Sequence, residues 1–226
     1  MIPIRDYNPS STFPLVTVSI ITVNTAIFIY MFFVIPDPVP IVDAYGLIPA
    51  RYTGMDAVRE FGFLRLAVAF YGSFFIHGGL LHLFGNMWFL WIFGDNIEDR
   101  LGHLRFVLFY LLAGTAGGIL FILTNPNAEV PCIGASGAVA GVLGAYMVIF
   151  PGAQILTLIP IFILFYFVTL PAFIVLLIWF LIQLLNAHVT GGLGSQVAWW
   201  AHVGGFVIGI VLILFMKKRK SFRNRS

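Results

Sequence analysis

Six stretches of roughly 20 mostly apolar residues constrain this chain most, because a helix of that length crosses a lipid bilayer. They cover residues 15–35, 72–94, 104–124, 134–150, 171–187 and 197–216. Apolar types make up 60% of the 226 residues and charged types only 9%, whereas a soluble domain carries roughly 25% charged residues. This composition excludes a soluble globular protein, a disordered protein and a coiled coil. The sequence predicts an all-α integral membrane protein with six transmembrane helices.

The segments around these stretches predict how the chain is organised. Residues 14–216 are expected to form one membrane domain, between a short segment 1–13 and a basic tail 217–226. Residues 36–70 mix charges with aromatic residues, which indicates an outer loop lying in the membrane interface. Residues 155–170 belong to an apolar run that is too long for one span and is broken by prolines. They are predicted to form an interfacial or re-entrant connection.

Basic residues predict the orientation, because short cytoplasmic segments are enriched in Lys and Arg. Half of the 12 basic residues lie in the tail, namely Lys217, Lys218, Arg219, Lys220, Arg223 and Arg225. With six spans, both termini are then cytoplasmic, and the predicted location is the cell membrane. The net charge of +3 comes from this tail and gives no indication of nucleic-acid binding.

Four polar side chains from three predicted helices are expected at one depth, just below the outer surface. His82 and Asn86 lie in the outer half of the second span, Ser136 lies in the first turn of the fourth, and His202 lies about one turn into the sixth. Polar and ionisable residues inside a membrane are costly and are usually functional. The sequence therefore predicts a site at this depth.

Ser136 lies among small residues, in the sequence Gly-Ala-Ser-Gly-Ala that begins at Gly134 and includes Gly137. A helix N-terminus offers unpaired N–H groups and the positive end of a dipole, which suit an oxyanion. The alternative interpretation is tight helix packing around a small polar residue, which is common in membranes.

His202 is followed by Gly205 and Gly209, whose four-residue spacing lets a neighbouring helix approach closely. The fourth span offers a matching surface of small residues: Ala140, Gly141, Gly144 and Ala145. Close packing of the two spans would bring His202 Nε2 towards Ser136 Oγ, and a serine needs such a base to act as a nucleophile. The alternative is an interfacial histidine bonded to a loop carbonyl.

The remaining polar residues complete this hypothesis. His82 and Asn86 are four residues apart, share a helix face, and could both donate to an oxyanion. No carboxylate is expected at the depth of His202, so a serine hydrolase here would use a dyad. His77 is expected to face a loop in a structural role. A structural turn is predicted at the inner end of the second span, formed by Asp95, Glu98, Asp99 and Arg100. The histidines lack metal-site spacing, so no metal or cofactor is expected.

From the second span to the sixth the chain resembles the rhomboid family of intramembrane serine proteases. The resemblance rests on His82 with Asn86, on Gly134, Ser136 and Gly137, and on Ala201-His202 followed by Gly205 and Gly209. It implies a six-helix rhomboid core, Ser136 as nucleophile and His202 as general base. It also implies an oxyanion hole made by the Ser136 N–H, His82 and Asn86.

The chain departs from the family pattern at two places. Some members carry a tyrosine one turn after the serine that stacks on the catalytic histidine, whereas this chain has Ala140. His202 must therefore be held otherwise, with packing alone as one explanation. The Trp-Arg pair of the first outer loop is absent, and Arg51, Arg59 and Arg65 are candidates to anchor that loop.

The expected substrate is a protein with a single transmembrane helix, which would reach Ser136 laterally between the second and fifth spans. A Gly-rich loop at residues 191–195 is predicted to act as a cap, with Leu193 and Val197 plugging the serine. Trp179 is predicted to help hold the fifth span in place as a gate.

Two other functions remain open at this stage. The leading alternative is a catalytically silent rhomboid-like protein that binds membrane clients. A small-solute transporter or channel is less well supported, because the sequence shows no inverted repeat and no mid-membrane charge. The sequence indicates no obligatory protein partner besides the lipid bilayer.

Overall fold

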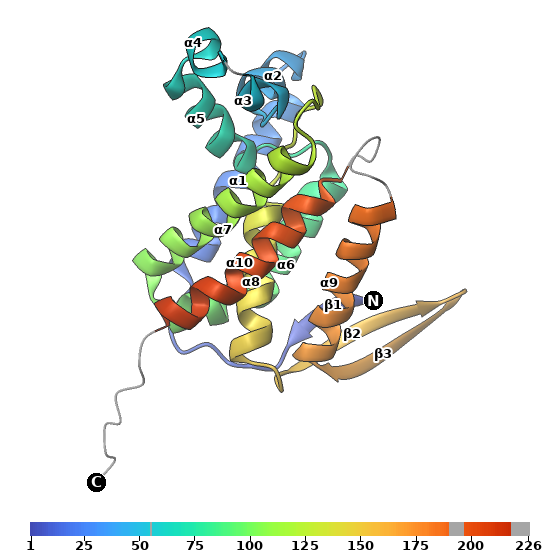
Figure 1. Cartoon of the computed structure of the whole chain (residues 1–226). Coiled ribbons are helices and arrows are strands. Elements are labelled where there is room, and N and C mark those ends of the chain that lie inside the picture. The colour runs from blue at the N-terminus through green and yellow to red at the C-terminus, as the bar shows by residue number, and fades with distance from the viewer. Residues whose placement is uncertain (55, 190–196, 218–226) are drawn as a thin grey trace.

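The computed structural model describes residues 1–54, 56–189 and 197–217. Figure 1 shows a bundle of long helices with a group of short helices at one end and a small β-sheet at the other. We call these the loop end and the tail end. The helices in chain order are α1 (Leu15–Phe33), α2 (Val39–Tyr45), α3 (Ala50–Thr53), α4 (Ala57–Phe61), α5 (Phe63–Gly72), the 3-10 helix η1 (Ser73–Phe75), α6 (Leu80–Leu101), α7 (His103–Thr124), α8 (Ser136–Ile149), α9 (Ala172–Val189) and α10 (Trp199–Met216).

The long helices confirm an apolar helical bundle of membrane-spanning type. By length and composition, four helices of the described chain can cross a membrane, namely α1, α7, α9 and α10. A fifth span results if α5, η1 and α6 are counted together, although they are bent by 82°. The 14 residues of α8 reach only about 21 Å at 1.5 Å per residue, less than the roughly 30 Å of a bilayer core. The count of six spans therefore stays a prediction.

The second predicted span differs most in its bounds. It was predicted over residues 72–94, but α6 begins at Leu80 and continues to Leu101. The consecutive glycines Gly78 and Gly79 separate α6 from η1, since glycine weakens a helix. The turn predicted around Asp95 and Glu98 is wrong, because these residues are helical and lie in the last turns of α6.

Buried polar contacts at the tail end explain why α6 extends so far. The Glu98 side chain is completely buried, and its carboxylate accepts hydrogen bonds from the backbone N–H groups of Val16 and Thr17, both at 2.8 Å. It also accepts a bond from the Thr17 hydroxyl at 2.7 Å and pairs with His103. These donors are at the first turn of α1, where helix N–H groups lack partners within the helix. Glu98 therefore caps α1 and joins it to α6.

A three-stranded antiparallel sheet adds β-structure that the sequence analysis did not predict. Strands β2 (Gln154–Ile161) and β3 (Leu164–Pro171) form a hairpin over the predicted connection 155–170, and β1 (Ile2–Asp6) pairs with β2. Figure 1 shows the hairpin projecting beside α9 at the tail end. The sheet explains how an apolar run too long for one helix is accommodated.

The core of the bundle lies around α8, whose residues 137–146 are all buried. Helix α10 crosses α8 at the small residues that the sequence predicted. A Cβ on Gly205 would overlap the carbonyl oxygen of Gly137, and a Cβ on Gly209 would overlap that of Gly141. Only glycine permits this approach of the two backbones, as in other close helix contacts in membranes.

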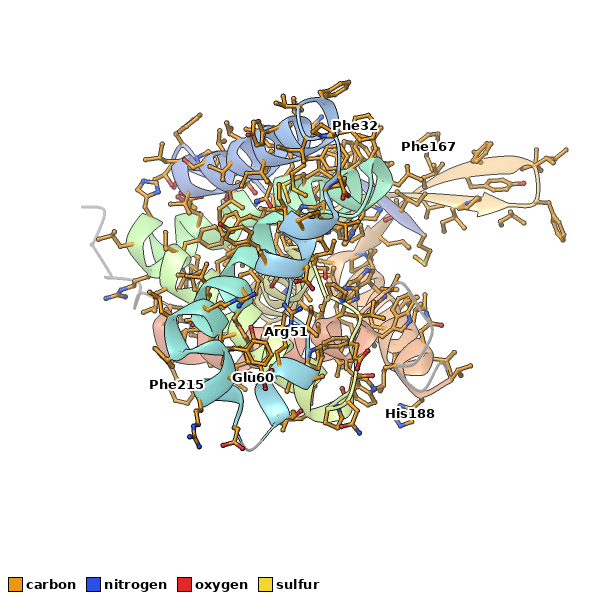
Figure 2. The ribbon with its side chains drawn as sticks, turned by 90° about the horizontal axis from the view of Figure 1, so that it is seen from above. Phe32, Arg51, Glu60, Phe167, His188 and Phe215 are labelled. Carbon is orange, nitrogen blue, oxygen red and sulfur yellow. The ribbon has the colours of Figure 1, made fainter. Side chains whose placement is uncertain are left out.

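The outer surface of the bundle is apolar. Figure 2 shows side chains projecting around it, including Phe32 on α1, Phe215 on α10 and Phe167 on the hairpin. These three side chains are 68%, 83% and 64% exposed. A soluble protein rarely exposes continuous apolar surface of this extent. The chain is therefore a multi-pass membrane protein.

Candidate functional site

Ser136 is the first residue of α8, and three contacts hold the loop that precedes it. Leu47 and Cys132 exchange two backbone hydrogen bonds, of 3.0 and 2.8 Å. The Gly134 N–H donates to the Ser73 carbonyl at 2.8 Å, and the Ala135 N–H donates to His77 Nε2 at 3.5 Å. His77 is therefore buried against this loop, as the sequence predicted. The start of the helix at Ser136 is therefore fixed by contacts that the preceding loop makes with other parts of the chain.

Gly134 brings this loop against the start of α6. Its φ angle of +116° lies in a region that favours glycine. A Cβ at this position would lie 2.7 Å from His82 Nε2 and 3.7 Å from Asn86 Nδ2. The two predicted oxyanion donors therefore face the backbone two residues before Ser136.

His202 reaches the same region through the contact between α8 and α10. A Cβ on Gly137 would lie 3.4 Å from the Ala201 carbonyl oxygen. The residues that meet across the two helices are thus the immediate neighbours of Ser136 and His202. His202 is 9% exposed and lies within electrostatic range of His82. The chain on either side of Ser136 therefore lies next to His82 and Asn86 at Gly134, and next to the neighbour of His202 at Gly137.

Helix α9 supplies two partners of the His202 ring, Gln183 and Trp179, and α10 itself supplies a third, Trp199. Gln183 Oε1 lies 2.8 Å from His202 Nδ1. The Trp179 ring lies against the imidazole with 5.9 Å between centroids, and Trp199 meets it edge-on at 6.0 Å. Packing alone therefore does not hold His202, because a buried amide bonds to it as well. Gln183 was not predicted from the sequence, although an amide within the apolar run 172–185 was a usable signal.

The predicted gate residues have mixed outcomes. The Trp179 ring contacts His202, Phe206 on α10 at 6.0 Å and Phe89 on α6 at 6.3 Å. Trp179 therefore supports the histidine in addition to joining α9 to its neighbours. Val197 lies just before α10 and is 38% exposed. Leu193 and the rest of the predicted cap lie outside the described residues, so the cap stays a prediction.

Among the three candidate arginines of the outer loop, Arg51 and Arg65 both lie over the Phe61 ring, and Arg51 also pairs with Asp43. The Arg51 guanidinium donates to the Asp43 backbone carbonyl at 2.7 Å and pairs with the Asp43 carboxylate. It lies 5.7 Å from the centroid of the Phe61 ring. Arg51 thus ties α2, α3 and α4 together at the loop end.

The arrangement contains the kinds of group that acyl transfer uses. It combines a hydroxyl at a helix N-terminus, an imidazole from a second helix, and an imidazole with an amide from a third. In the described part of the chain, no three His, Cys, Asp or Glu side chains gather as a metal site.

Comparison with known proteins gives consistent matches. The sequence model of the Rhomboid domain matches residues 60–219. RHOMBOID-like protein 5 of Arabidopsis thaliana is 32% identical over 151 residues, which is 66% of this chain and 44% of that protein. Rhomboid protease GluP of Bacillus subtilis is 42% identical over 72 residues, 32% of this chain and 14% of that protein. Putative rhomboid protease YdcA of Bacillus subtilis is 38% identical over 72 residues, 32% of this chain and 36% of that protein.

The matched regions span less than half the length of each of these relatives. The domain match, in contrast, covers most of this chain and includes every helix that contributes Ser136, His202, His82 and Asn86. The chain therefore belongs to the rhomboid family.

Proposed function

We propose that the chain is an intramembrane serine endopeptidase that cleaves transmembrane helices near the outer face of the membrane. The observation that carries the proposal is the glycine contact between α8 and α10, at which the chain neighbours of Ser136 and His202, Gly137 and Ala201, meet. Two of the matched bacterial relatives are named as a rhomboid protease and a putative one. These names support a protease more than they support a silent client-binding protein.

In the proposed reaction, Ser136 Oγ attacks the scissile carbonyl while His202 Nε2 accepts its proton. The Ser136 N–H at the start of α8, with His82 and Asn86, stabilises the oxyanion. His202 then protonates the leaving amine, and an ester remains on Ser136. A water molecule that gives its proton to His202 hydrolyses this ester and frees the serine. Base and nucleophile form a dyad, without the carboxylate of the usual triad.

The proposed substrate is a single transmembrane helix that arrives sideways from the bilayer. Its scissile segment must unwind, because a carbonyl within an intact helix is hydrogen-bonded. Access between α6 and α9 is supported by their contact through the rings of Phe89 and Trp179. Side chains can move apart at such a contact more easily than two backbones packed on glycines.

The proposed orientation places the tail end in the cytoplasm and the loop end outside. The basic residues of the tail support this, since cytoplasmic segments are enriched in Lys and Arg. Arg105 lies at the same end of the bundle, where its guanidinium donates to the Met216 carbonyl at 3.3 Å. Ser136 then opens towards the outer side of the cell membrane.

Labelling with a serine-directed fluorophosphonate tests the proposal. The purified full-length chain should be labelled, and it should cleave a model single-span substrate in liposomes. Ser136→Ala should abolish both signals. His202→Ala should lower both by several orders of magnitude, because it removes the base. If the folded wild-type protein is not labelled and does not cleave the substrate, that result would favour the silent client-binding alternative. A pull-down of membrane clients would then test that alternative.

A further inference from the structure

Gln183 is an amide in the middle of an apolar membrane helix, and its side chain is 6% exposed. Burying an amide without hydrogen bonds costs several kcal/mol in an apolar medium. Here both ends of the amide have partners. The Nε2 group donates to the Trp179 carbonyl at 3.1 Å, and Oε1 lies 2.8 Å from His202 Nδ1.

These two contacts determine which nitrogen of His202 carries the proton. A backbone carbonyl only accepts hydrogen bonds, so the Trp179 carbonyl must face the NH₂ end of the amide. The oxygen end then faces His202, and an amide oxygen also only accepts. His202 Nδ1 must therefore carry the hydrogen. In the neutral ring this leaves the lone pair on Nε2, the nitrogen farther from Gln183.

We propose that Gln183 is the positioning residue of the site, which holds His202 in the tautomer that can accept the Ser136 proton. The inference rests on the proposed protease function, in which His202 is the base. A carboxylate performs this task in the usual triad, but a carboxylate buried within a membrane bundle would be costly. A neutral amide orients the ring without adding a charge. It is held in turn by the backbone of Trp179, whose ring contacts the same imidazole.

Substitution of Gln183 should affect the chemical step. Gln183→Met keeps the shape of the side chain and removes the hydrogen bond. We expect kcat for a single-span substrate to fall by about 10–100-fold, the factor found when a metal-bound histidine loses the group that orients it, while KM changes little. Leu176→Met, at a fully buried position on the same helix, is the matched control and should retain the wild-type kcat. A wild-type kcat in Gln183→Met would overturn the proposal.

Gln183→Glu provides a readout that a merely structural role would not change. The carboxylate accepts the same hydrogen bond and stabilises the protonated imidazole of His202. We therefore expect the acid limb of the pH–kcat profile to shift upwards by about one pH unit or more, with activity restored on the alkaline side. His82 also acts on His202 and is unchanged in this comparison. An acid limb at the wild-type position would contradict the proposal.

Nitrogen-15 NMR of the histidine rings separates this inference from the proposed function. Subtracting the spectrum of His202→Ala isolates the signals of His202 in the full-length wild-type chain. A protonated Nδ1 and an unprotonated Nε2 are expected at neutral pH, and the reverse assignment would overturn the proposal. The measurement needs neither activity nor a folded Gln183 variant. If fluorophosphonate does not label wild-type Ser136, the proposed protease function is wrong. The spectrum still tests whether His202 Nδ1 donates a hydrogen bond to Gln183.

Discussion

Gly205 on α10 lies so close to Gly137 on α8 that the Gly137 carbonyl oxygen occupies the space that a Cβ on residue 205 would need. Gly137 directly follows the proposed nucleophile Ser136, and Gly205 lies three residues after the proposed base His202. The separation of the two helices therefore also sets the separation of Ser136 and His202.

Gly205→Val should inactivate the protein without touching either member of the dyad. The new side chain would force α10 away from α8, because it would meet the backbone of Gly137, which cannot rotate aside as a side chain could. Both substrate cleavage and the thermal unfolding temperature should fall. Gly85→Ala on α6 is the control, since a Cβ there meets nothing within 4 Å. Full activity in Gly205→Val would show that this contact does not position the dyad.

Gly134→Ala should lower kcat through His82. The substitution strains a backbone with φ of +116° and places a carbon 2.7 Å from His82 Nε2. If His82 is an oxyanion donor, its displacement should cost about 10²–10³-fold in kcat, and His82→Ala should cost a similar factor. Gly78→Ala is the control, because its Cβ would make an ordinary contact with Ile133 at 3.5 Å. Equal kcat values for both glycine variants would argue against an oxyanion role for His82.

Glu98→Gln should destabilise the fold and leave the chemistry unchanged. Glutamine offers one acceptor oxygen in place of two, and its NH₂ group would face donors that the carboxylate now satisfies. We expect a loss of about 2–4 kcal/mol in the free energy of unfolding, measured by denaturant titration in detergent micelles. Asp99→Asn, whose hydrogen bonds to Ser11 and Thr12 are solvent-exposed, should cost much less. Equal losses would contradict the capping role of Glu98.

Asp6 should make stability depend on pH. Its carboxylate accepts hydrogen bonds from the Tyr146 hydroxyl at 2.7 Å and from the Asn96 amide at 3.0 Å. Burial, with the nearby charge of Asp95, raises the pKa of Asp6 from 3.8 to about 6. The folded state therefore favours the protonated form. The cost of keeping Asp6 ionised is complete above about pH 6 and disappears as the pH falls towards 4.

Asp6→Asn should remove this cost. At pH 7 we expect the variant to be more stable by about 1 kcal/mol, a value that allows for solvent screening of a half-exposed group. Thermal unfolding from pH 4 to pH 8 measures it. The wild type should gain stability below pH 6 relative to the variant, and parallel curves for the two proteins would contradict the prediction.

The sequence predicted the helices best where an apolar run has the length of one span. The first span was predicted over residues 15–35 and α1 covers Leu15–Phe33; the third was predicted over 104–124 and α7 covers His103–Thr124. The hairpin was missed, because an apolar run does not reveal whether it is a buried strand or a helix. Its β-branched and aromatic residues, such as Thr169, Val168 and Tyr166, were the usable signal.

The sequence predicted those residues of the candidate site that are unusual by their type and position alone. Ser136, His202, His82 and Asn86 stood out because polar groups are rare in these helices, and counting spans placed them at one depth. The hydrogen bond that His202 donates to Gln183 depends on the rotation of α9 about its own axis. That rotation is set by tertiary packing, which no local pattern in the sequence reports.

The attachment of α9 at the tail end has a mechanical consequence. Its first residues are fastened to the segment after α8, because the Ala172 N–H donates to the Ala153 carbonyl at 2.8 Å and the Phe173 N–H donates to the Pro151 carbonyl at 3.0 Å. The helix therefore resembles a cantilever, whose displacement grows with distance from its clamp. Gln183 lies eleven residues from Ala172, about 16 Å along the axis. A tilt of about 10° would carry the amide about 3 Å at that distance, enough to break its hydrogen bond with His202. If the proposed substrate helix enters by such a swing, the same movement would release the proposed base until α9 returns.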